Sequence, residues 1–548
     1  MPIATVGAPF SMRDTVRGEQ VARSATCATL KLRRKRASFI CSPTICIFCS
    51  NFRGNLVPIV LFAITVIYHI ICKGNTFSLF YDWLRHFCTL QYVIQMTIHL
   101  ANQYKIIIFA INLGMLYTVK TEYDIMNVTL ENYRTLNFDT IDIKEEWNMP
   151  AEREHRMHSI HAYPAKFPAF ITTKAIQKAE EKNISVDIVA DIFCGCGTVA
   201  FETVKNGKSF WGCDINPVAT LIAKTKSLSY NDGLLGDYYD NIISCYNESS
   251  INEDDEIYKN ERVRYWFDDE HINDLLKLKT AIYEKVDNEI YRNFFLCAFS
   301  NILKPCSRWL TKSIKPQIDP NKQPKNVLAS FNAQIRMMRN ANLDEITKKQ
   351  GCAEINCTNF LDVNIETPFV DLVVTSPPYV TSYEYADLHQ LSTLWLGYTD
   401  DFRTLREGTI GSLYHAENFD ENIKILNETA LDIVYKMYST DKRKTRSVAQ
   451  YYIDMQGSIH KVYKMLKPNG ACLFVIGNTE YKGVKIDNAK HLTECLLKEG
   501  FVDVEVDRRK ISNKILTPYR DANGKFASVK GSSRKIYSEE FVIFARKE

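Results

Sequence analysis

Three short stretches of the chain combine residue types that can bind a cofactor and hold a reacting base. They are DIFCGCGT (191–198), GCDIN (212–216) and TSPPY (375–379). The first supplies glycines, the second a carboxylate, and the third two prolines between a serine and a tyrosine. Each stretch follows a short apolar run, so each is expected to lie where a strand ends.

The glycine stretch places Gly195 and Gly197 between Phe193 and Thr198. Glycine lets the chain turn tightly and lets the backbone approach a ligand before a helix begins. A turn of this kind at a strand end can hold a nucleotide cofactor. An ordinary strand-to-helix turn has a similar composition, so this stretch alone leaves both interpretations open.

Asp214 ends the second apolar run, about twenty residues after the glycines. A carboxylate at this position can accept hydrogen bonds from both ribose hydroxyls of an adenosine. Capping of the helix that begins near Pro217 is an alternative role, and the two roles are compatible. Together the two stretches predict a cofactor that contains adenosine.

The TSPPY stretch ends DLVVTS, the fourth strand candidate in chain order. A proline-containing turn that merely ends a strand is the simplest interpretation of these residues alone. In a doubly wound sheet that begins at its centre, however, the fourth strand lies beside the first. The end of this strand would then meet the cofactor, which favours a catalytic role.

The elements that must position these residues read as short apolar strands alternating with helices. This pattern predicts an α/β, Rossmann-like fold with a seven-stranded, mostly parallel sheet. The last two strands are close in sequence and are expected to pair like a hairpin. The strand candidates are VDIVADIF (186–193), KSFWGCDI (208–215), CAEINCTN (352–359), VDLVVTS (370–376), ACLFVIGN (471–478), FVDVEVDRR (501–509) and EEFVIFARK (539–547).

Four segments follow from this pattern. Residues 126–230 form the first half of the predicted α/β domain, and residues 351–548 form the second half. Residues 231–350 form an inserted, mainly helical region, because the gap between the second and third strands is far longer than a crossover needs. Residues 1–125 are basic and hydrophobic and differ from all that follows.

The chain has 68 basic and 64 acidic residues, a net charge of +4, and its basic excess lies in the first 125 residues. This segment contains KLRRKR (31–36) and NLVPIVLFAITVIYHIIC (55–72). Three interpretations stay open: translation from upstream of a natural start at Met126, a membrane or targeting segment, or a folded accessory domain. Sixteen scattered cysteines indicate reduced thiols and a cytoplasmic protein.

These motifs resemble those of the S-adenosylmethionine-dependent amino methyltransferases of DNA, which modify cytosine N4 or adenine N6. FCGCG (193–197) is similar to the F-x-G-x-G cofactor motif, and SPPY (376–379) to the catalytic motif in the form typical of N4-cytosine enzymes. HSIHAYPAKFPAFI (158–171) is similar to the segment that precedes the cofactor motif. The resemblance covers residues 150–548 in scattered blocks.

The resemblance implies a mechanism and the residues that perform it. An exocyclic amine is a poor nucleophile because its lone pair is delocalised into the ring, and acceptors placed against its N–H bonds free that lone pair. The acceptors would be the Ser376 side chain and the Pro377 carbonyl, held by Pro377 and Pro378, while Tyr379 stacks on a base flipped out of the duplex. The implied cofactor contacts are Asp191, Phe193, Gly195, Gly197, Thr198, Asp214, Asn359 and Lys166.

DNA contact is expected from the basic and aromatic part of the insert. A cation-flanked aromatic suits phosphate neutralisation and base contact, and the candidates are Arg308, Trp309, Lys312 and Lys315. The charge run at 441–446 could also contact phosphate, although runs of this kind are usually mobile surface.

Two further residue groups suggest rival chemistries. Pro305-Cys306 invites comparison with the nucleophile of C5-cytosine methyltransferases, but it follows no apolar strand. His155, His158 and His161 are spaced by three, yet no further ligand set accompanies them, so no metal is expected.

The sequence therefore predicts a site-specific DNA methyltransferase acting on cytosine N4 in double-stranded DNA, with S-adenosylmethionine as cofactor and a cognate restriction endonuclease as partner. N6-adenine methylation, RNA methylation and an inactive DNA-binding or membrane-tethered factor are the alternatives. Membrane contact is expected only if residues 1–125 belong to the native protein.

Overall fold

A computed structural model of the chain describes most of the residues from Asn127 onwards. The predictions for residues 1–125 lie outside the described residues. The described ranges are 127–148, 153–164, 166–250, 255–313, 315–343, 351–380, 385–412, 419–511, 519–520, 534–535 and 539–548.

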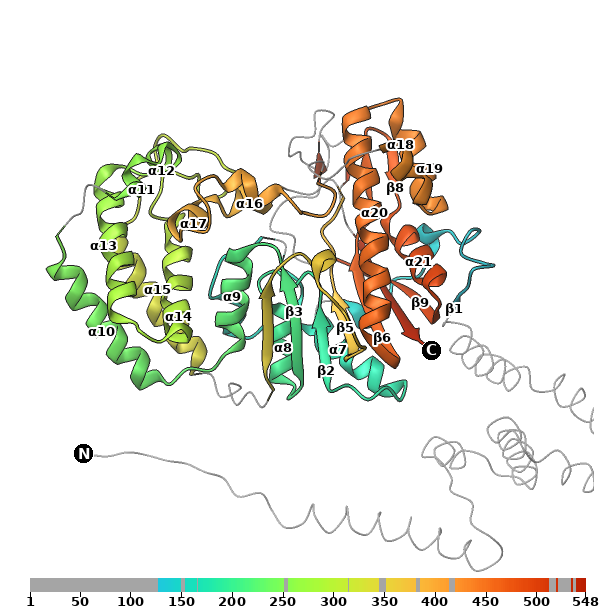
Figure 1. Cartoon of the computed structure of the whole chain (residues 1–548), viewed down its shortest axis with the longest axis horizontal. Helices are drawn as coiled ribbons and strands as arrows, with labels where there is room; N and C mark the ends of the chain where they lie inside the picture. The colour runs from blue at the N-terminus through green and yellow to red at the C-terminus, as the bar shows by residue number, and fades with distance from the viewer. Residues whose placement is uncertain are drawn as a thin grey trace, which may run out of the picture. The chain divides into compact units, whose positions relative to one another are not determined.

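A mostly parallel sheet forms the centre of the described fold (Figure 1). Four consecutive pairings, β6–β5, β5–β2, β2–β3 and β3–β4, are parallel. In spatial order, the eight strands of this sheet among the described residues are β1 (Asn127–Val128), β9 (Phe501–Lys510), β12 (Glu539–Lys547), β6 (Leu466–Ile476), β5 (Val370–Thr375), β2 (Ile188–Asp191), β3 (Ser209–Asp214) and β4 (Ala353–Cys357).

This strand order confirms the predicted Rossmann-like fold. The fourth predicted strand, β5, pairs with the first, β2, in parallel. The last strand, β12, is antiparallel to both neighbours and lies between β6 and β9. One strand was not predicted: β1 adds an eighth member by pairing antiparallel with β9, and its two residues are too short for a periodic pattern.

Side chains alternate between two faces of the sheet, and each face is covered by helices. On β6, Leu473 and Val475 join the core on one face, whereas Cys472 and Phe474 join the core on the other. This alternation follows from the two-residue period of a strand. The helices of the first face are α7 (Ala169–Glu181), α8 (Thr198–Lys205) and α9 (Pro217–Ser227), and those of the second are α19 (Glu428–Tyr438), α20 (Lys442–Met465) and α21 (Asn488–Glu499).

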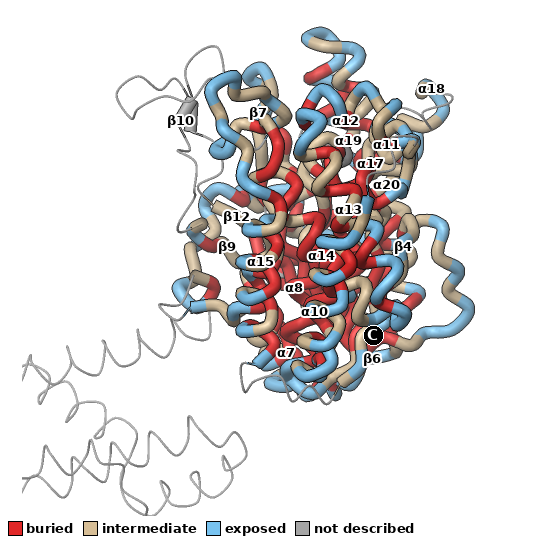
Figure 2. Tube along the Cα trace, turned by 90° about the vertical axis from the view of Figure 1, so that its left-hand side faces the viewer, coloured by how far each residue is buried: buried red, intermediate tan, exposed pale blue. Residues whose placement is uncertain are grey.

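A helical lobe follows α9 and lies at the left of Figure 1. Its core is continuous with the outer side of α9, and Figure 2 shows buried residues running through the interior of the molecule. The lobe consists of α10 (Asp232–Glu248), α11 (Glu256–Lys259), α12 (Glu261–Trp266), α13 (Asp269–Lys285), α14 (Glu289–Leu303), α15 (Val327–Asn342), α16 (Tyr385–Leu388) and α17 (Gln390–Trp395).

The last two helices of the lobe come from beyond the predicted insert. Leu391, Leu394 and Trp395 of α17 are buried in the same core as the insert helices. The segment that follows TSPPY therefore leaves the sheet and folds with residues 231–350. A linear division at residue 350 does not describe the helical lobe completely.

The charge run at 441–446 forms the cap and first turn of α20, and its Lys442, Arg443 and Arg446 side chains are exposed at the surface. Asp441 accepts a hydrogen bond from the Lys444 backbone N–H at 3.0 Å and caps α20. The Asp441 carboxylate also accepts from the hydroxyl of Tyr481 at 2.9 Å. These bonds lower its pKa to about 2, the Lys444 N–H being the largest cause.

No helix among the described residues is long and apolar enough to cross a membrane.

The remaining elements are short. The short elements are η1 (Phe138–Thr140), η2 (Glu145–Trp147), η3 (Arg156–Ser159), η5 (Phe360–Asp362), η6 (Phe402–Arg406), α18 (Phe419–Asn422), η8 (Ile423–Ile425), and the antiparallel pairs β7 (Thr479–Tyr481) with β8 (Val484–Ile486) and β10 (Tyr519–Arg520) with β11 (Arg534–Lys535).

Candidate cofactor and catalytic site

The three predicted stretches meet at one edge of the sheet. β3, β2 and β5 are neighbours and run in parallel, so their carboxyl ends lie side by side. Asp214, Asp191 and Thr375 are the last residues of these three strands. Ligands of open α/β sheets bind at this edge, where the strand order reverses.

The loop that contains Gly195 and Gly197 can adopt its conformation only with glycine at position 197. Its φ of 73° lies in the left-handed region, and a Cβ there would lie 2.6 Å from the Cα of Ala223 on α9. The loop can therefore pack closely against α9 only without a side chain at this position. Gly195 also has a positive φ, 47°, and its backbone N–H donates to Asp214 Oδ2 at 2.9 Å.

Asp214 connects the glycine loop to the start of α9. Its Oδ1 accepts from the Asn216 N–H at 2.9 Å, while its Oδ2 accepts from Gly195. Burial raises the pKa of this carboxyl, and the two N–H donors oppose that shift. Each oxygen keeps a second lone pair, which leaves acceptors for the hydroxyls of a ribose.

Asp191 joins the cofactor loop to the catalytic strand. Its Oδ1 accepts from the Thr375 hydroxyl at 2.6 Å and from the Phe193 N–H at 3.1 Å. Burial raises the pKa of Asp191 to about 7, against the lowering effect of both bonds. Thr375 was not selected from the sequence, although its place directly before Ser376 was the available signal.

Ser376 and Pro377 come directly after Thr375 and carry hydrogen-bond acceptors. Neither the Ser376 hydroxyl nor the Pro377 carbonyl has a hydrogen bond to the part of the chain that the structure describes. Ser376 is partly exposed, in contrast to the buried Thr375. At the end of β5, both expected acceptors therefore lack a described hydrogen bond, with Ser376 partly exposed and Pro377 buried.

Tyr379 ends the motif with its ring against the core and its hydroxyl anchored. The ring packs beside the core on the α19–α21 face of the sheet, and Pro378 before it is partly exposed. The Tyr379 hydroxyl donates to Glu540 Oε1 on β12 at 2.8 Å. This partner is distant in sequence, and no local pattern pointed to it.

His389 and Tyr163 lie beside the cofactor loop. The Tyr163 hydroxyl is 3.5 Å from the position that a Cβ on Gly195 would occupy, and its ring stacks on His389 with centroids 5.1 Å apart. Asn216 Oδ1 accepts from the Val218 N–H, so its Nδ2 donates to His389 Nδ1 at 2.7 Å. The imidazole proton therefore lies on Nε2.

The Nε2 atom of His389 is buried and has no hydrogen-bond partner among the described residues. Burial lowers the pKa of His389 to about 4, so the ring is neutral near neutral pH and Nε2 is a donor only. A buried donor without a partner is costly, which fits a position that a ligand completes. The sequence patterns described above did not single out His389.

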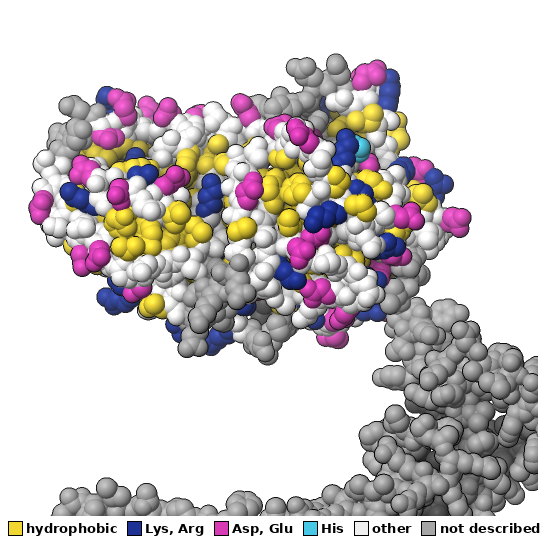
Figure 3. Space-filling view, turned by 60° about the horizontal axis from the view of Figure 1, so that its bottom comes forward, with side chains coloured by type: hydrophobic (Ala, Val, Ile, Leu, Met, Phe, Trp, Pro, Cys, Tyr) yellow, Lys and Arg dark blue, Asp and Glu magenta, His cyan; other side chains and the backbone are white. Residues whose placement is uncertain are grey.

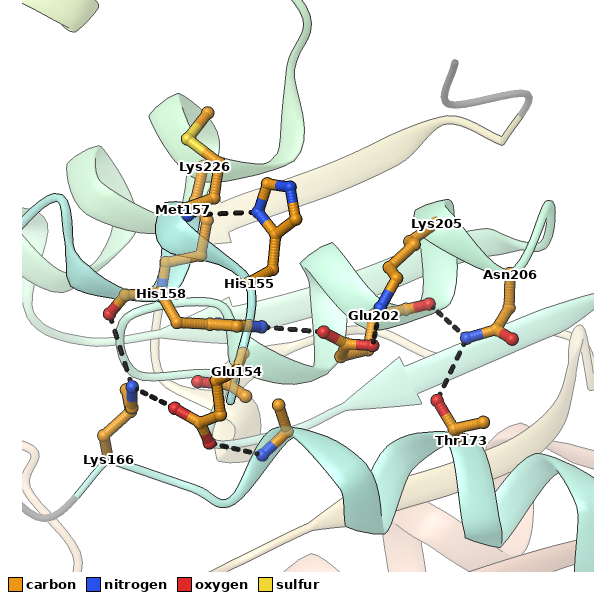
Figure 4. A network of polar contacts seen from close by, with 12 residues as sticks. Glu154, His155, Met157, His158, Lys166, Thr173, Glu202, Lys205, Asn206 and Lys226 are labelled. Carbon is orange, nitrogen blue, oxygen red and sulfur yellow. Dashed lines mark hydrogen bonds and ion pairs between the residues drawn. The ribbon is translucent and has the colours of Figure 1, made fainter. Parts of the chain in front are cut away.

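The three histidines before the cofactor loop diverge instead of converging on a metal. His155 Nδ1 accepts from the Met157 N–H at 3.1 Å and His158 Nε2 pairs with Glu202 at 2.7 Å (Figure 4). His161 Nε2 pairs with Ser300 at 2.9 Å. Burial lowers the pKa of His158 to about 4. The described residues contain no group of three His, Cys, Asp or Glu that could hold a metal ion.

Lys166 and Asn359 are engaged by the protein. Lys166 Nζ donates to Glu154 Oε2 at 2.6 Å and to the His158 carbonyl at 3.3 Å, as Figure 4 shows. Asn359 Oδ1 accepts from the Leu361 N–H at 3.0 Å, and its Nδ2 donates to the Gly408 carbonyl at 3.1 Å. The pairing of Lys166 with Glu154 argues against the predicted contact with a cofactor carboxylate.

Phe193 and Thr198 lie on either side of the glycine loop and are partly or fully buried. Phe193 is partly buried and packs beside the core on the α19–α21 face. Thr198 is buried and begins α8, which makes it the first residue after the glycines. Both positions are compatible with the predicted cofactor contacts through the backbone of the loop.

The four predicted DNA contacts in the insert differ in burial and in partners. Trp309 is buried, stacks on Trp266 with centroids 4.9 Å apart, and is therefore part of the lobe core and closed to a base. Arg308 donates to the carbonyls of Arg264 and Tyr265. Lys312 and Lys315 are exposed. Basic and acidic groups are intermixed on the face of the molecule in Figure 3.

Cys306 does not have the setting of a nucleophile. It is buried in the helical lobe, after α14. Burial raises the pKa of its thiol, whereas a reactive cysteine needs a lowered pKa. The structure therefore argues against the C5-cytosine chemistry weighed above.

The residues present fit S-adenosylmethionine. This cofactor carries two cations, a carboxylate and two ribose hydroxyls, and the site offers the carboxylates of Asp191 and Asp214, the unpartnered Nε2–H of His389, and a loop closed to any side chain at Gly197. Together with the strand order, this site defines a Rossmann-like S-adenosylmethionine-dependent methyltransferase.

Comparisons with known proteins agree on a narrower group. The DNA methylase family model, N6_N4_Mtase, matches residues 42–225, a span that includes the glycine loop and ends before Ser376. Over this span the chain is similar to the N4/N6 DNA methylases.

Two curated relatives carry type II methyltransferase names. Type II methyltransferase M.MvaI of Kocuria varians is 24% identical over 385 residues, which cover 65% of this chain and 84% of the relative. Type II methyltransferase M.AvaI of Nostoc sp. (strain PCC 7120) is 24% identical over 392 residues, covering 62% of this chain and 78% of the relative.

Solved structures align only loosely. A S-adenosylmethionine-dependent methyltransferase from Methanosarcina mazei aligns with a TM-score of 0.22 and 11% identity, over 71% of this chain and 98% of that chain. The precorrin-8w decarboxylase of Methanobacterium thermoautotrophicum aligns with a TM-score of 0.25 and 9% identity, over 71% and 97%. The fold assignment therefore rests on the strand order.

Proposed function

We propose that this chain methylates the exocyclic N4 amine of cytosine in double-stranded DNA at a specific site. The observation that carries the proposal is the position of Ser376, Pro377, Pro378 and Tyr379 directly after Thr375, whose hydroxyl is bonded to Asp191 of the cofactor loop. In the family that the sequence resembles, the S-P-P-Y form is typical of N4-cytosine enzymes.

The protein's own groups would act mainly by orientation. The Ser376 hydroxyl and the Pro377 carbonyl accept hydrogen bonds from the two N–H groups of the target amine, which favours a pyramidal nitrogen with a free lone pair. The prolines hold that carbonyl in a fixed geometry and offer no competing N–H. S-adenosylmethionine supplies the electrophilic methyl group when it is bound.

The cofactor would be held from three sides. Asp214 accepts hydrogen bonds from hydroxyl groups, the backbone of the glycine loop approaches closely, and Asp191 places a carboxyl near cationic groups. Tyr379 stacks on the flipped base, which offsets part of the few kcal/mol that flipping costs. No covalent bond between protein and base is needed.

The direct test is to identify the methylated base. DNA treated with the protein and S-adenosylmethionine would be digested to nucleosides and analysed by mass spectrometry. N4-methylcytosine is the expected product. N6-methyladenine would overturn the cytosine assignment and leave the similarity to the N4/N6 DNA methylases intact, while transfer to RNA but not to duplex DNA would support the RNA alternative.

The names of the relatives add a biological setting. Because these are type II methyltransferases, we propose that the chain is the modification half of a restriction-modification system with a cognate endonuclease. Sequencing methylated positions in a genome with and without this protein would report the base and the recognition site together. Absence of a fixed sequence around the methylated positions would contradict this setting.

A further inference from the structure

We infer that Glu540 and Arg509, on the last two strands of the sheet, position the ring of Tyr379 for stacking on the target base. This inference rests on the proposed function, because it assigns partners to the tyrosine of the catalytic motif. The bond from the Tyr379 hydroxyl to Glu540 Oε1, 2.8 Å long, joins residues 161 positions apart in the chain.

Glu540 is itself held in place. Its Oε2 accepts from Arg509 on β9 at 2.7 Å, so its two oxygens are divided between the tyrosine and the arginine. The Glu540 side chain is 15% exposed and the Arg509 side chain 1%. A carboxylate shared in this way has little freedom to follow a rotating tyrosine.

Arg509 is anchored on its far side. Its Nε donates to the Trp147 carbonyl at 3.0 Å, and its guanidinium lies 5.7 Å from the centroid of the Phe170 ring. The Trp147 indole donates in turn to Asp507 at 2.9 Å. The tyrosine hydroxyl is thus the outer end of a chain of contacts that runs into the buried part of the sheet.

The topology explains why the last strand supplies this anchor. β12 is antiparallel to β6, so its first residues lie at the same edge as the carboxyl ends of the parallel strands. Phe541, directly after Glu540, is opposite Ile476, the last residue of β6. Reversal of this one strand brings a residue from the end of the chain to the catalytic edge.

The hydrogen bond separates two tasks of the tyrosine. The ring is the surface on which a base can stack, whereas the hydroxyl sets where the ring lies. Removing the hydroxyl by Tyr379→Phe should therefore leave the stacking surface but release its orientation. Glu540→Ala should have the same effect through the partner.

The experiment compares wild-type protein with Tyr379→Phe, Glu540→Ala, the double variant, and Glu539→Gln. Glu539 is the matched control, because it precedes Glu540 on β12 but pairs with Arg508, at 3.3 Å. Each protein is tested for kcat on DNA, for S-adenosylmethionine Kd by calorimetry, for Tm, and for the fluorescence of 2-aminopurine placed at the target position once the site is known.

We expect Tyr379→Phe and Glu540→Ala each to lower kcat by about 10- to 100-fold, the effect of losing a hydrogen bond to a charged group. Both should reduce the flipped-base fluorescence, with S-adenosylmethionine Kd within about twofold of wild type. The double variant should be no worse than the more affected single variant, because both changes remove one interaction. Glu539→Gln should resemble the wild type.

Two results would overturn the inference: kcat and fluorescence of Tyr379→Phe equal to wild type, or single effects that multiply in the double variant. If Glu540→Ala does not fold because Arg509 is left unpaired, Tyr379→Phe decides alone, since it leaves the charge pair intact. Failure of wild-type protein to methylate DNA would instead refute the proposed function, so the two failures are distinguishable.

Discussion

Ser376 is the residue on which the proposed chemistry depends most directly. Its hydroxyl makes no hydrogen bond to the described part of the chain, so Ser376→Ala removes an acceptor for the substrate and no described internal contact. We expect kcat to fall by about 100-fold, the usual effect of losing one oriented hydrogen-bonding group at a reacting centre. S-adenosylmethionine Kd should change by less than about twofold, as measured by calorimetry. Equal activity of the variant and wild type would contradict the assigned role.

The raised pKa of Asp191 predicts that the free energy of unfolding depends on pH. Its pKa in the folded protein is about 7, above the 3.8 of an exposed carboxyl, so the folded state binds this proton more tightly than the unfolded state. Its stabilising contribution is complete below about pH 4 and is lost as pH rises to about 7. The Asp191→Asn variant has no ionisable carboxyl at this position, so its stability does not have this pH dependence.

The free energy of unfolding of Asp191→Asn, relative to wild type, should therefore rise between pH 4 and 7. The expected change is on the order of 4 kcal/mol at about 1.4 kcal/mol per pKa unit. Urea unfolding at several pH values measures it. Buried histidines such as His158 and His389 titrate in both proteins and cancel in the difference. A difference that stays constant with pH would show that Asp191 titrates normally in the folded protein.

At the scale of the element, the glycine loop and α9 offer a matched pair of substitutions. Gly197 and Gly207 have similar φ values, 73° and 74°, but a Cβ at Gly197 meets Ala223 whereas a Cβ at Gly207 meets nothing within 4 Å. Gly207→Ala should cost about 1–2 kcal/mol from backbone strain alone. Gly197→Ala should cost roughly 1–3 kcal/mol more, because it overpacks the loop against α9.

Urea unfolding and calorimetry distinguish these effects. Only Gly197→Ala should also weaken S-adenosylmethionine binding, since only this change displaces the loop that holds the cofactor. Equal destabilisation by the two variants would mean that the loop moves away from α9 without cost. In that case close packing would not be the reason for glycine at Gly197.

Element boundaries show where sequence patterns were sufficient. All seven predicted strands are present, because apolar runs bounded by turns encode a buried strand locally. The start of α20 was missed, since its first turn is polar and is defined by the cap at Asp441. The place of α17 in the helical lobe was also missed, because a buried helix and its partner need not be near in sequence.

At the scale of the whole molecule, the fold after residue 126 should be sufficient for cofactor binding. The described sheet, both helical layers and the predicted site lie within residues 127–548. We expect a protein beginning at Met126 to keep the Tm and the S-adenosylmethionine Kd of the full chain. Thermal unfolding and calorimetry on both proteins test this. Loss of cofactor binding would show that the first 125 residues take part in the site.

The sequence by itself determined the fold class, the three loops at the strand ends and the candidate catalytic residues. Glycine turns, terminal carboxylates and proline-rich strand ends are local features, and the order of strands follows from general rules of α/β topology. The resemblance to the N4/N6 DNA methylases, and the cofactor that it implies, rest on the same residues. These features depend on neighbours within a few positions.

Only the tertiary structure decided how distant side chains pair. Tyr379 meets Glu540, Lys166 meets Glu154, and Trp309 is buried against Trp266. Each contact joins residues that are distant in sequence and that are brought together by packing of the cores, so no local pattern could predict it. The physical reason is that periodicity indicates which face of an element is buried, whereas long-range packing decides what lies against that face.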